Sequence, residues 1–324
     1  FNRDSDLYPG MQQGDNGQSL VLGGLNEDGT DSYNLLSELC LKASLELKVI
    51  DPKINLRVHE KTPLDTYILG TQLTKQGLGF PQYSNDDVVI PGLMELGYKE
   101  KYAYRYVVAA CWEFIIPGTA MDIPNIEALS FTKAVSDAVM EKLEQCRSYE
   151  EFEEAVRNKI NSQVEALCKQ VNGVYLYPAP FLSLMMEGCC EKGIDVSLGC
   201  KYNNYGFHGT GIATAADSMA AVKKFVYEEK STDALSLVKA LKNDFESDEL
   251  LCNRLRYEST KMGNDNDYVD GIAVRLLNIF ADSLKGRSND RGGIYRAGTG
   301  SAMYYIRHAE NLPATPDGRR KGEG

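Results

Sequence analysis

The feature that most constrains the fold of this chain is a regular alternation between helical patterns and short extended runs. An alternating strand-like run at residues 55–59 lies between two helical patterns at residues 31–48 and 63–76. Further helices are predicted over residues 126–146, 148–171, 214–229, 231–245 and 268–284. No linker rich in Pro, Gly and Ser interrupts the series, so the alternation predicts an α/β architecture.

Capping residues strengthen two of these helix assignments. Thr62 is the predicted N-cap of the helix over residues 63–76, and Gly77 suits the position just after its end. Ser148, followed by Glu151 three residues later, forms a capping-box pattern at the start of the helix over residues 148–171.

One apolar run, residues 107–118, contains both a thiol and a carboxylate. Residues 102–110 fit a helix or a strand, and the segment around Cys111 fits a strand or a tight loop. If the run is a strand, its side-chain period of two places Cys111 and Glu113 on the same face. Burying a thiol beside a carboxylate costs free energy, so the pair is a candidate for chemistry.

The surroundings of Cys111 favour a thiol over a thiolate. A nucleophilic thiolate needs a nearby cation, and no histidine lies close to Cys111 in the sequence. Its apolar neighbours and the carboxylate of Glu113 both disfavour a negative charge on sulfur. These features suit a hydrogen-atom donor and acceptor, with Glu113 as general acid or base. The alternative is structural: a buried core thiol and a carboxylate satisfied by a neighbour.

Composition excludes several function classes. The 35 basic and 46 acidic residues give a net charge of −11, and the only basic run is Arg319-Arg320-Lys321, which argues against nucleic acid as a partner. No run of eighteen apolar residues predicts a membrane span. The eight cysteines contain no CxxC pair and there are only three histidines, so no metal site is predicted and a reducing, cytoplasmic compartment is expected.

Several sequence blocks, in order, resemble the glycyl radical enzymes, the pyruvate formate-lyase-like family. They include Gly77-Leu78-Gly79-Phe80-Pro81, the Cys111-Trp112-Glu113 segment, and further blocks at residues 22–24, 28–29, 34–37, 85–90, 190–195, 201–203, 211–218, 296–299 and 313–319. Each block alone is weak, but their order is specific to the family. The resemblance covers essentially the whole chain.

This resemblance implies a fold and a reaction. The fold is part of a ten-stranded barrel of two antiparallel half-barrels surrounded by helices, with a central loop that carries the active cysteine, matched here by Cys111. Cys111 would become a transient thiyl radical that takes a hydrogen atom from a small-molecule substrate. No cofactor is expected to be bound. The radical originates on a backbone glycine that a separate radical S-adenosylmethionine activating enzyme oxidises, and a homodimer is implied.

Glu113 matches the carboxylate of the family's Cys-x-Glu subgroup, which contains dehydratases, other lyases and arylacetate decarboxylases. Pyruvate formate-lyase itself has two adjacent cysteines on this loop, whereas Trp112 follows Cys111 here and suggests an aromatic-lined pocket. Cys189 and Cys190 are adjacent but belong to another block. Asp122 is a further candidate for substrate binding.

The expected function is that of a glycyl radical lyase or dehydratase that cleaves a C–O, C–N, C–S or C–C bond in a small polar substrate. An arylacetate decarboxylase or a formate acetyltransferase-like enzyme is the alternative. The chain does not begin with Met, and the family's glycyl loop is not found in it. We therefore expect one pyruvate formate-lyase-like domain over residues 1–324, incomplete at both ends. A chain truncated in this way would be inactive alone, so a truncated homologue acting as a binding or scaffold protein is the alternative of another class.

Overall fold

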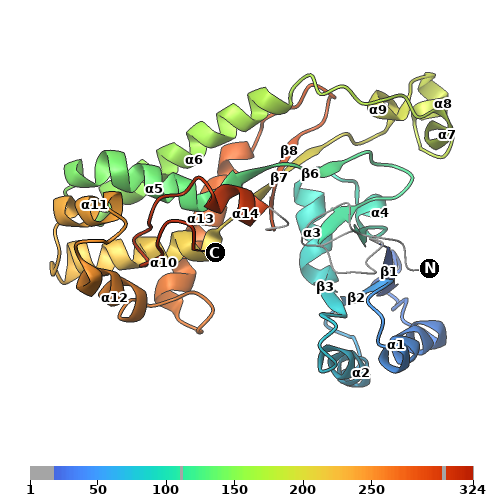
Figure 1. Ribbon diagram of the computed structural model, residues 1–324. Helices are drawn as coiled ribbons and strands as arrows, with labels where there is room; N and C mark the ends of the chain where they lie inside the picture. The colour runs from blue at the N-terminus through green and yellow to red at the C-terminus, as the bar shows by residue number, and fades with distance from the viewer. Residues whose placement is uncertain (1–17, 110–111, 301–303, 324) are drawn as a thin grey trace. The chain divides into compact units, whose positions relative to one another are not determined.

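The computed structural model describes residues 18–109, 112–300 and 304–323 (Figure 1). The chain divides into two compact units, each built from two segments. The first unit comprises Phe1–Met121 and Pro178–Tyr202, and the second comprises Asp122–Tyr177 and Asn203–Gly324. Helices and strands alternate in both units, which confirms the α/β class. The single domain over residues 1–324 stays a prediction.

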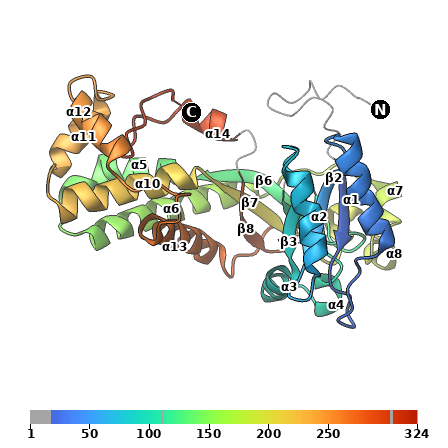
Figure 2. The same cartoon turned by 90° about the horizontal axis from the view of Figure 1, so that it is seen from below.

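A parallel three-stranded sheet forms the base of the first unit. Its order is β1-β2-β3, with β1 at Ser19–Gly23, β2 at Lys53–Val58 and β3 at Gln82–Asn85. Helices α1 (Leu35–Leu47) and α2 (Leu64–Thr74) lie against this sheet (Figure 2). Leu41 and Leu73 of the helices pack with Leu56 of the central strand, and all three are fully buried. Burial of apolar surface on one face therefore fixes this layer.

The remaining elements of the first unit include the segment that carries the candidate site. Helices α3 (Asp86–Glu95) and α4 (Glu100–Ala103) precede strands β4 (Val107–Ala109) and β5 (Glu113–Ile115). Three short helices follow in the second segment: α7 (Pro180–Ser183), α8 (Cys189–Lys192) and α9 (Val196–Gly199). The predicted strand at residues 55–59 corresponds to β2, which confirms that assignment.

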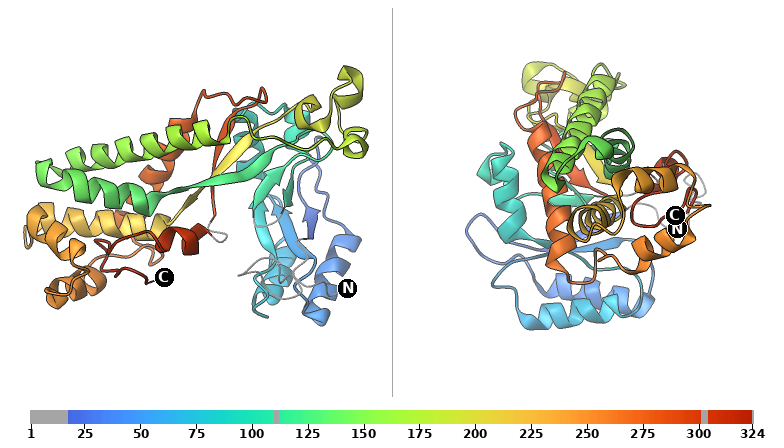
Figure 3. Two further views of the ribbon diagram at one scale, coloured as in Figure 1. Left: turned by 45° about the horizontal axis from the view of Figure 1, so that its top comes forward. Right: turned by 90° about the vertical axis from the view of Figure 1, so that its left-hand side faces the viewer.

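The second unit is built on another parallel sheet, of order β6-β7-β8. Its strands are β6 (Ile123–Ser130), β7 (Tyr205–Thr210) and β8 (Tyr295–Thr299). The main helices are α5 (Phe131–Lys142), α6 (Tyr149–Val171), α10 (Ile212–Val222) and α13 (Asp267–Leu284), with a buried core between them and the sheet (Figure 3). The shorter helices are α11 (Ala234–Lys242), α12 (Glu249–Tyr257), α14 (Tyr304–Ala309) and a 3-10 turn at Leu143–Gln145.

One predicted helix is wrong in its first part. Residues 126–130 of the predicted helix over 126–146 belong to β6, and the helix begins only at Phe131. The strand forms because it pairs with β7 along Glu127–Ser130, a contact between residues about eighty positions apart. Ser130 then caps the helix by accepting a hydrogen bond from the backbone N–H of Lys133 at 3.2 Å.

The helix boundaries differ from the predictions in smaller ways. Thr62 does not cap α2, because its hydroxyl accepts the backbone N–H of His59 at 2.9 Å and Pro63 occupies the N-cap position. Ser148 caps α6 as predicted, but the Glu151 carboxylate accepts the N–H of Arg147 instead of completing the capping box. The helix predicted at 214–229 continues beyond α10 as a π-helical turn, Lys223–Glu228.

The described strands form two parallel three-stranded sheets and one antiparallel pair. The ten-stranded barrel of the resemblance therefore stays a prediction. Among the described helices, none is long and apolar enough to cross a membrane.

Candidate functional site

The predicted thiol–carboxylate segment is a hairpin. Strands β4 and β5 pair antiparallel, with Val107 opposite Ile115, Val108 opposite Phe114 and Ala109 opposite Glu113. Of the two interpretations of the segment around Cys111, one continuous strand is excluded, because the chain reverses between Ala109 and Glu113, which agrees with the alternative of a tight loop. The same-face argument for Cys111 and Glu113 no longer applies. Cys111 lies outside the described residues.

Glu113 is the last paired residue of the hairpin, and its carboxylate bonds to the neighbouring backbone. Its Oε2 accepts a hydrogen bond from the N–H of Trp112 at 2.8 Å. Glu113 is half-buried, whereas the Trp112 side chain is 49% exposed in this chain. The structure thus brings together two of the predicted site residues, and it holds the carboxylate against the residue that follows Cys111 in the sequence.

The hairpin rests on a buried aromatic base. Val108 and Ile116 are each 1% exposed and pack with Tyr106, which is fully buried. The Phe114 ring meets the Tyr106 ring edge-on, with centroids 5.4 Å apart. Both strands are therefore anchored from the side of Tyr106.

A buried ion pair lies directly beneath this base. Arg57 of β2 donates from Nε to Asp86 Oδ1 at 2.9 Å and from Nη2 to Asp86 Oδ2 at 2.8 Å, a bidentate contact. Asp86 also accepts the hydroxyl of Tyr106 at 2.6 Å and the backbone N–H of Leu25 at 2.6 Å. The Asp86 side chain has no exposed surface, so these four donors replace the water it has lost.

Arg57 extends this network to the chain just before β4. Its Nη1 donates to the carbonyl oxygens of Tyr104 at 3.0 Å and Tyr106 at 3.3 Å, and its guanidinium carbon lies 4.1 Å from the centre of the Tyr106 ring. Burial, followed by the charge of Asp86, raises the pKa of the Tyr106 phenol, which therefore stays a hydrogen-bond donor. Sequence reasoning did not assign this network, because its partners are far apart in the chain. The only signal in the sequence was that Asp86 lies within the family block at residues 85–90.

A second polar contact holds the helix before the hairpin. Tyr102 of α4 donates its hydroxyl to Glu187 Oε1 at 2.5 Å and accepts from Lys201 Nζ at 2.7 Å, while Lys201 and Glu187 form an ion pair at 3.1 Å. The hydrogen bonds from Tyr102 and Lys201 lower the pKa of Glu187, which keeps it ionised. These three side chains, which we call the Tyr102 clamp, tie the Pro178–Tyr202 segment to α4.

Asp122, the remaining predicted site residue, belongs to the second unit. Its side chain is 1% exposed, its Oδ1 accepts the N–H of Asn204 at 2.8 Å, and its Oδ2 lies 3.5 Å from Nη1 of Arg296. The carboxylate thus has one structural partner on β8 and one directly before β7. A contact between Asp122 and substrate stays a prediction. Among the described residues, no three His, Cys, Asp or Glu side chains gather as a metal site would require.

Comparison with known proteins identifies the family to which this chain belongs. The sequence matches the profile described as "Pyruvate formate lyase-like" over residues 3–306. It is 29% identical to trans-4-hydroxy-L-proline dehydratase of Clostridioides difficile, over 93% of this chain and 41% of that protein. It is 28% identical to (2S)-3-sulfopropanediol dehydratase of Klebsiella oxytoca, over 96% of this chain and 40% of that protein.

A solved structure gives the same result for the fold. The glycerol-bound form of the B12-independent glycerol dehydratase from Clostridium butyricum aligns with a TM-score of 0.89 at 29% identity, covering 100% of this chain and 44% of that one. The chain spans about two fifths of the length of the curated relatives it matches. The profile match over nearly all of its length shows that this chain belongs to the pyruvate formate lyase-like family of glycyl radical enzymes.

Proposed function

We propose that this chain supplies the cysteine loop of a glycyl radical lyase that acts on a small polar substrate. The observation that carries the proposal is the register of the hairpin, in which Ala109 pairs with Glu113. Only three residues then connect the strands, and Cys111 is the middle one. The carboxylate of Glu113, two residues after Cys111 in the sequence, thus stands at the start of β5.

The proposed chemistry divides between these two side chains. A glycyl radical, formed by an activating enzyme, supplies the oxidising equivalent that converts the Cys111 thiol into a thiyl. Cys111 takes a hydrogen atom from a substrate carbon, and Glu113 takes the proton from the hydroxyl on that carbon. The leaving group departs from the adjacent carbon, with a proton where needed, and Cys111 returns the hydrogen atom. The net change for a vicinal diol is loss of water and formation of a carbonyl compound.

The substrate class follows from the relatives. The two curated relatives are named for dehydration of a hydroxylated amino acid and of a sulfonated diol, and the structural relative binds glycerol. We therefore propose a substrate with a hydroxyl or an amino group on the carbon next to the one that carries the leaving group. Arylacetate decarboxylation is the alternative, favoured by the exposed indole of Trp112 and by the 24% identity to the indoleacetate decarboxylase of Tractidigestivibacter scatoligenes.

The test uses the full polypeptide, activated without oxygen and screened against diols, hydroxyproline, hydroxysulfonates and arylacetates. Cys111→Ser is expected to abolish turnover while the glycyl signal in electron paramagnetic resonance persists. Glu113→Gln should no longer dehydrate the substrate. It should still exchange hydrogen between the substrate and the Cys111 thiol, which is labelled from the solvent. Cys190→Ser, an exposed thiol of another block, is the matched control and should turn over normally.

Two results would contradict the proposal. Turnover by Cys111→Ser would remove the thiyl from the mechanism. A full polypeptide that never develops a glycyl signal with any activating enzyme would favour the alternative of a catalytically idle binding or scaffold protein. Decarboxylation of an arylacetate without dehydration of any diol would support the alternative enzyme class.

A further inference from the structure

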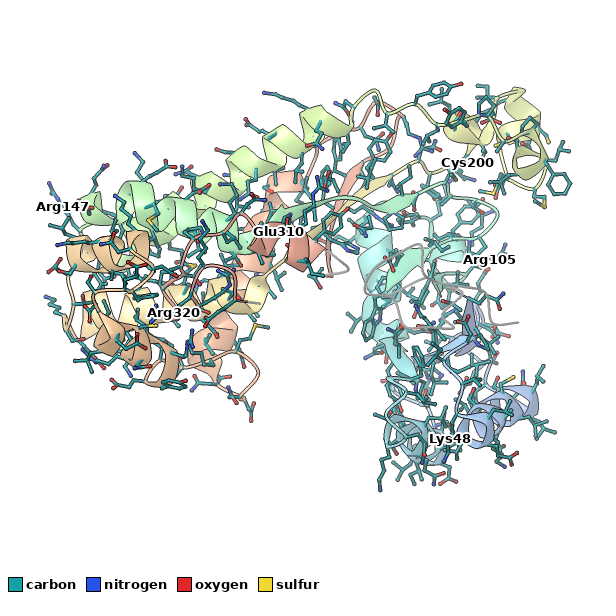
Figure 4. The ribbon with its side chains drawn as sticks, viewed as in Figure 1. Lys48, Arg105, Arg147, Cys200, Glu310 and Arg320 are labelled. Carbon is teal, nitrogen blue, oxygen red and sulfur yellow. The ribbon has the colours of Figure 1, made fainter. Side chains whose placement is uncertain are left out.

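Two buried thiols of the first unit lie in contact. Cys189 opens helix α8 and Cys200 directly follows α9, and their sulfur atoms are 3.8 Å apart. Each residue is 2% exposed (Figure 4 labels Cys200). Neither thiol belongs to the hairpin, and the proposed reaction uses neither of them.

The backbone around these thiols is closely packed, and two glycines make their contact possible. A Cβ on Gly188 would lie 2.9 Å from the carbonyl oxygen of Gly199, and a Cβ on Gly199 would lie 2.9 Å from the sulfur of Cys189. Glycine at both positions therefore permits the two segments to approach. A disulfide bond is about 2.05 Å long, so each sulfur would have to move by roughly 0.9 Å, a distance that a small side-chain rotation supplies.

The surroundings suit a disulfide better than a metal ion. The apolar side chains packed with the two cysteines are Val196, Met121 and Met186. The nearby ammonium of Lys192 donates to the carbonyl oxygen of Gly199 at 2.9 Å and is not a metal ligand. A structural zinc site takes four ligands, and within the described part of the chain no third His, Cys, Asp or Glu joins this pair. The chemistry open to two adjacent thiols in such a site is oxidation to a disulfide.

The two cysteines are close in sequence to two residues of the Tyr102 clamp. Glu187 precedes Cys189 by two residues, and Lys201 follows Cys200 directly. Their side chains meet at the hydroxyl of Tyr102 in α4, the helix that leads into β4. A covalent bond between the two cysteines would hold both arms of the clamp at a fixed separation.

We propose that Cys189 and Cys200 form a reversible redox site whose disulfide locks the Tyr102 clamp in the arrangement described. Oxidation removes two electrons and two protons from the two thiols and forms one S–S bond. The acceptor is a two-electron oxidant: an azo compound such as diamide takes up both hydrogens to become a hydrazine, and a peroxide becomes water. A dithiol reductant reverses the step by thiol–disulfide exchange.

Tryptic digestion separates the two thiols, which makes the test direct. Trypsin cleaves after Lys169, Lys192 and Lys201, so Cys189 and Cys190 fall in peptide 170–192 and Cys200 in peptide 193–201. The folded, full polypeptide is treated with diamide, blocked with N-ethylmaleimide and digested without reductant. We expect the two peptides to be joined with the loss of two hydrogen atoms, and fragmentation should assign the bond to Cys189.

The variants and the melting temperature complete the test. Cys190→Ser should still form the link, and Cys189→Ser should lose it. The oxidised protein should melt at a higher temperature than the reduced protein. Treatment with dithiothreitol should return the melting temperature to that of the reduced protein. A link that forms only after unfolding in urea would overturn the proposal. A link through Cys190, which is exposed, would overturn it as well.

Discussion

Replacing Asp86 by Asn is expected to destabilise the first unit strongly. The substitution keeps the shape of the side chain but removes the charge that faces the buried Arg57 guanidinium, and the amide NH₂ cannot accept from it. Breaking one partner of a buried ion pair costs about 3–5 kcal/mol, because the remaining charge is left uncompensated. Asp86 accepts from four donors in a site without solvent, so we expect a loss of unfolding free energy within that range.

An exposed ion pair in the same chain provides the matched control. Asp137 pairs with Lys133 one turn away on α5 at 2.8 Å, with side chains 33% and 57% exposed. Such surface pairs contribute about 0.5 kcal/mol or less. Asp137→Asn should therefore leave the urea unfolding curve almost unchanged, although it makes the same chemical substitution as Asp86→Asn.

Urea unfolding of the 324-residue chain measures the difference. Trp112 is the only tryptophan and lies on the hairpin above the network, so its fluorescence reports the first unit, and far-UV circular dichroism reports the whole chain. The pair replaced together, Arg57→Met with Asp86→Leu, should be less destabilising than Asp86→Asn alone, since no charge is left buried. A loss below about 1 kcal/mol for Asp86→Asn, or one no larger than that of Asp137→Asn, would refute the reasoning.

Three further predictions concern residues of the second unit, two of them with controls in the first unit. Phe280→Ala should cost about 3–5 kcal/mol of unfolding free energy, because the ring is fully buried, whereas Phe181→Ala, 78% exposed, should change it by less than about 0.5 kcal/mol in the same urea assay. Gly206→Ala should destabilise by about 1–3 kcal/mol, since a Cβ would lie 2.1 Å from a backbone carbonyl oxygen of β6, while Gly92→Ala, with no atom within 4 Å, should be neutral or stabilising by up to about 1 kcal/mol. Burial lowers the pKa of His308, so the unfolded chain binds this proton more readily, and stability should fall as the pH drops through the ordinary value of about 6.5; His308→Gln should flatten that part of the stability profile.

The helices could be predicted from the sequence where their apolar periodicity is strong, whether or not a cap was recognised. Helix α6 runs from Tyr149 to Val171 against a prediction of 148–171, and α13 begins one residue before its predicted start. Both signals are local, so they are complete within the sequence of the helix itself. Strand β6 could not be recognised in this way, because its conformation is decided by pairing with β7, far along the chain.

The candidate site shows the same division between local and non-local information. Glu113 and Trp112 could be named from the sequence, since the thiol–carboxylate pattern is contiguous. The Arg57–Asp86 pair could not, because its members are separated by 29 positions and each alone is an ordinary charged residue. The pattern also left the local geometry open between a strand and a tight loop, and only the pairing of β4 with β5 distinguishes the two.

The hairpin changes the geometry from which the contacts of Glu113 must be explained. In a continuous strand, residues two apart share a face but stand about 6.6 Å apart along the chain. In the hairpin, Glu113 closes the pairing of β4 with β5, and its carboxylate accepts the N–H of Trp112. The position of this hairpin depends on the residues packed beneath it. Apolar residues could fill this space without the free-energy cost of desolvating the charges of Arg57 and Asp86. A buried bidentate ion pair at this position is therefore better explained by the fixed geometry that it imposes than by a gain in stability.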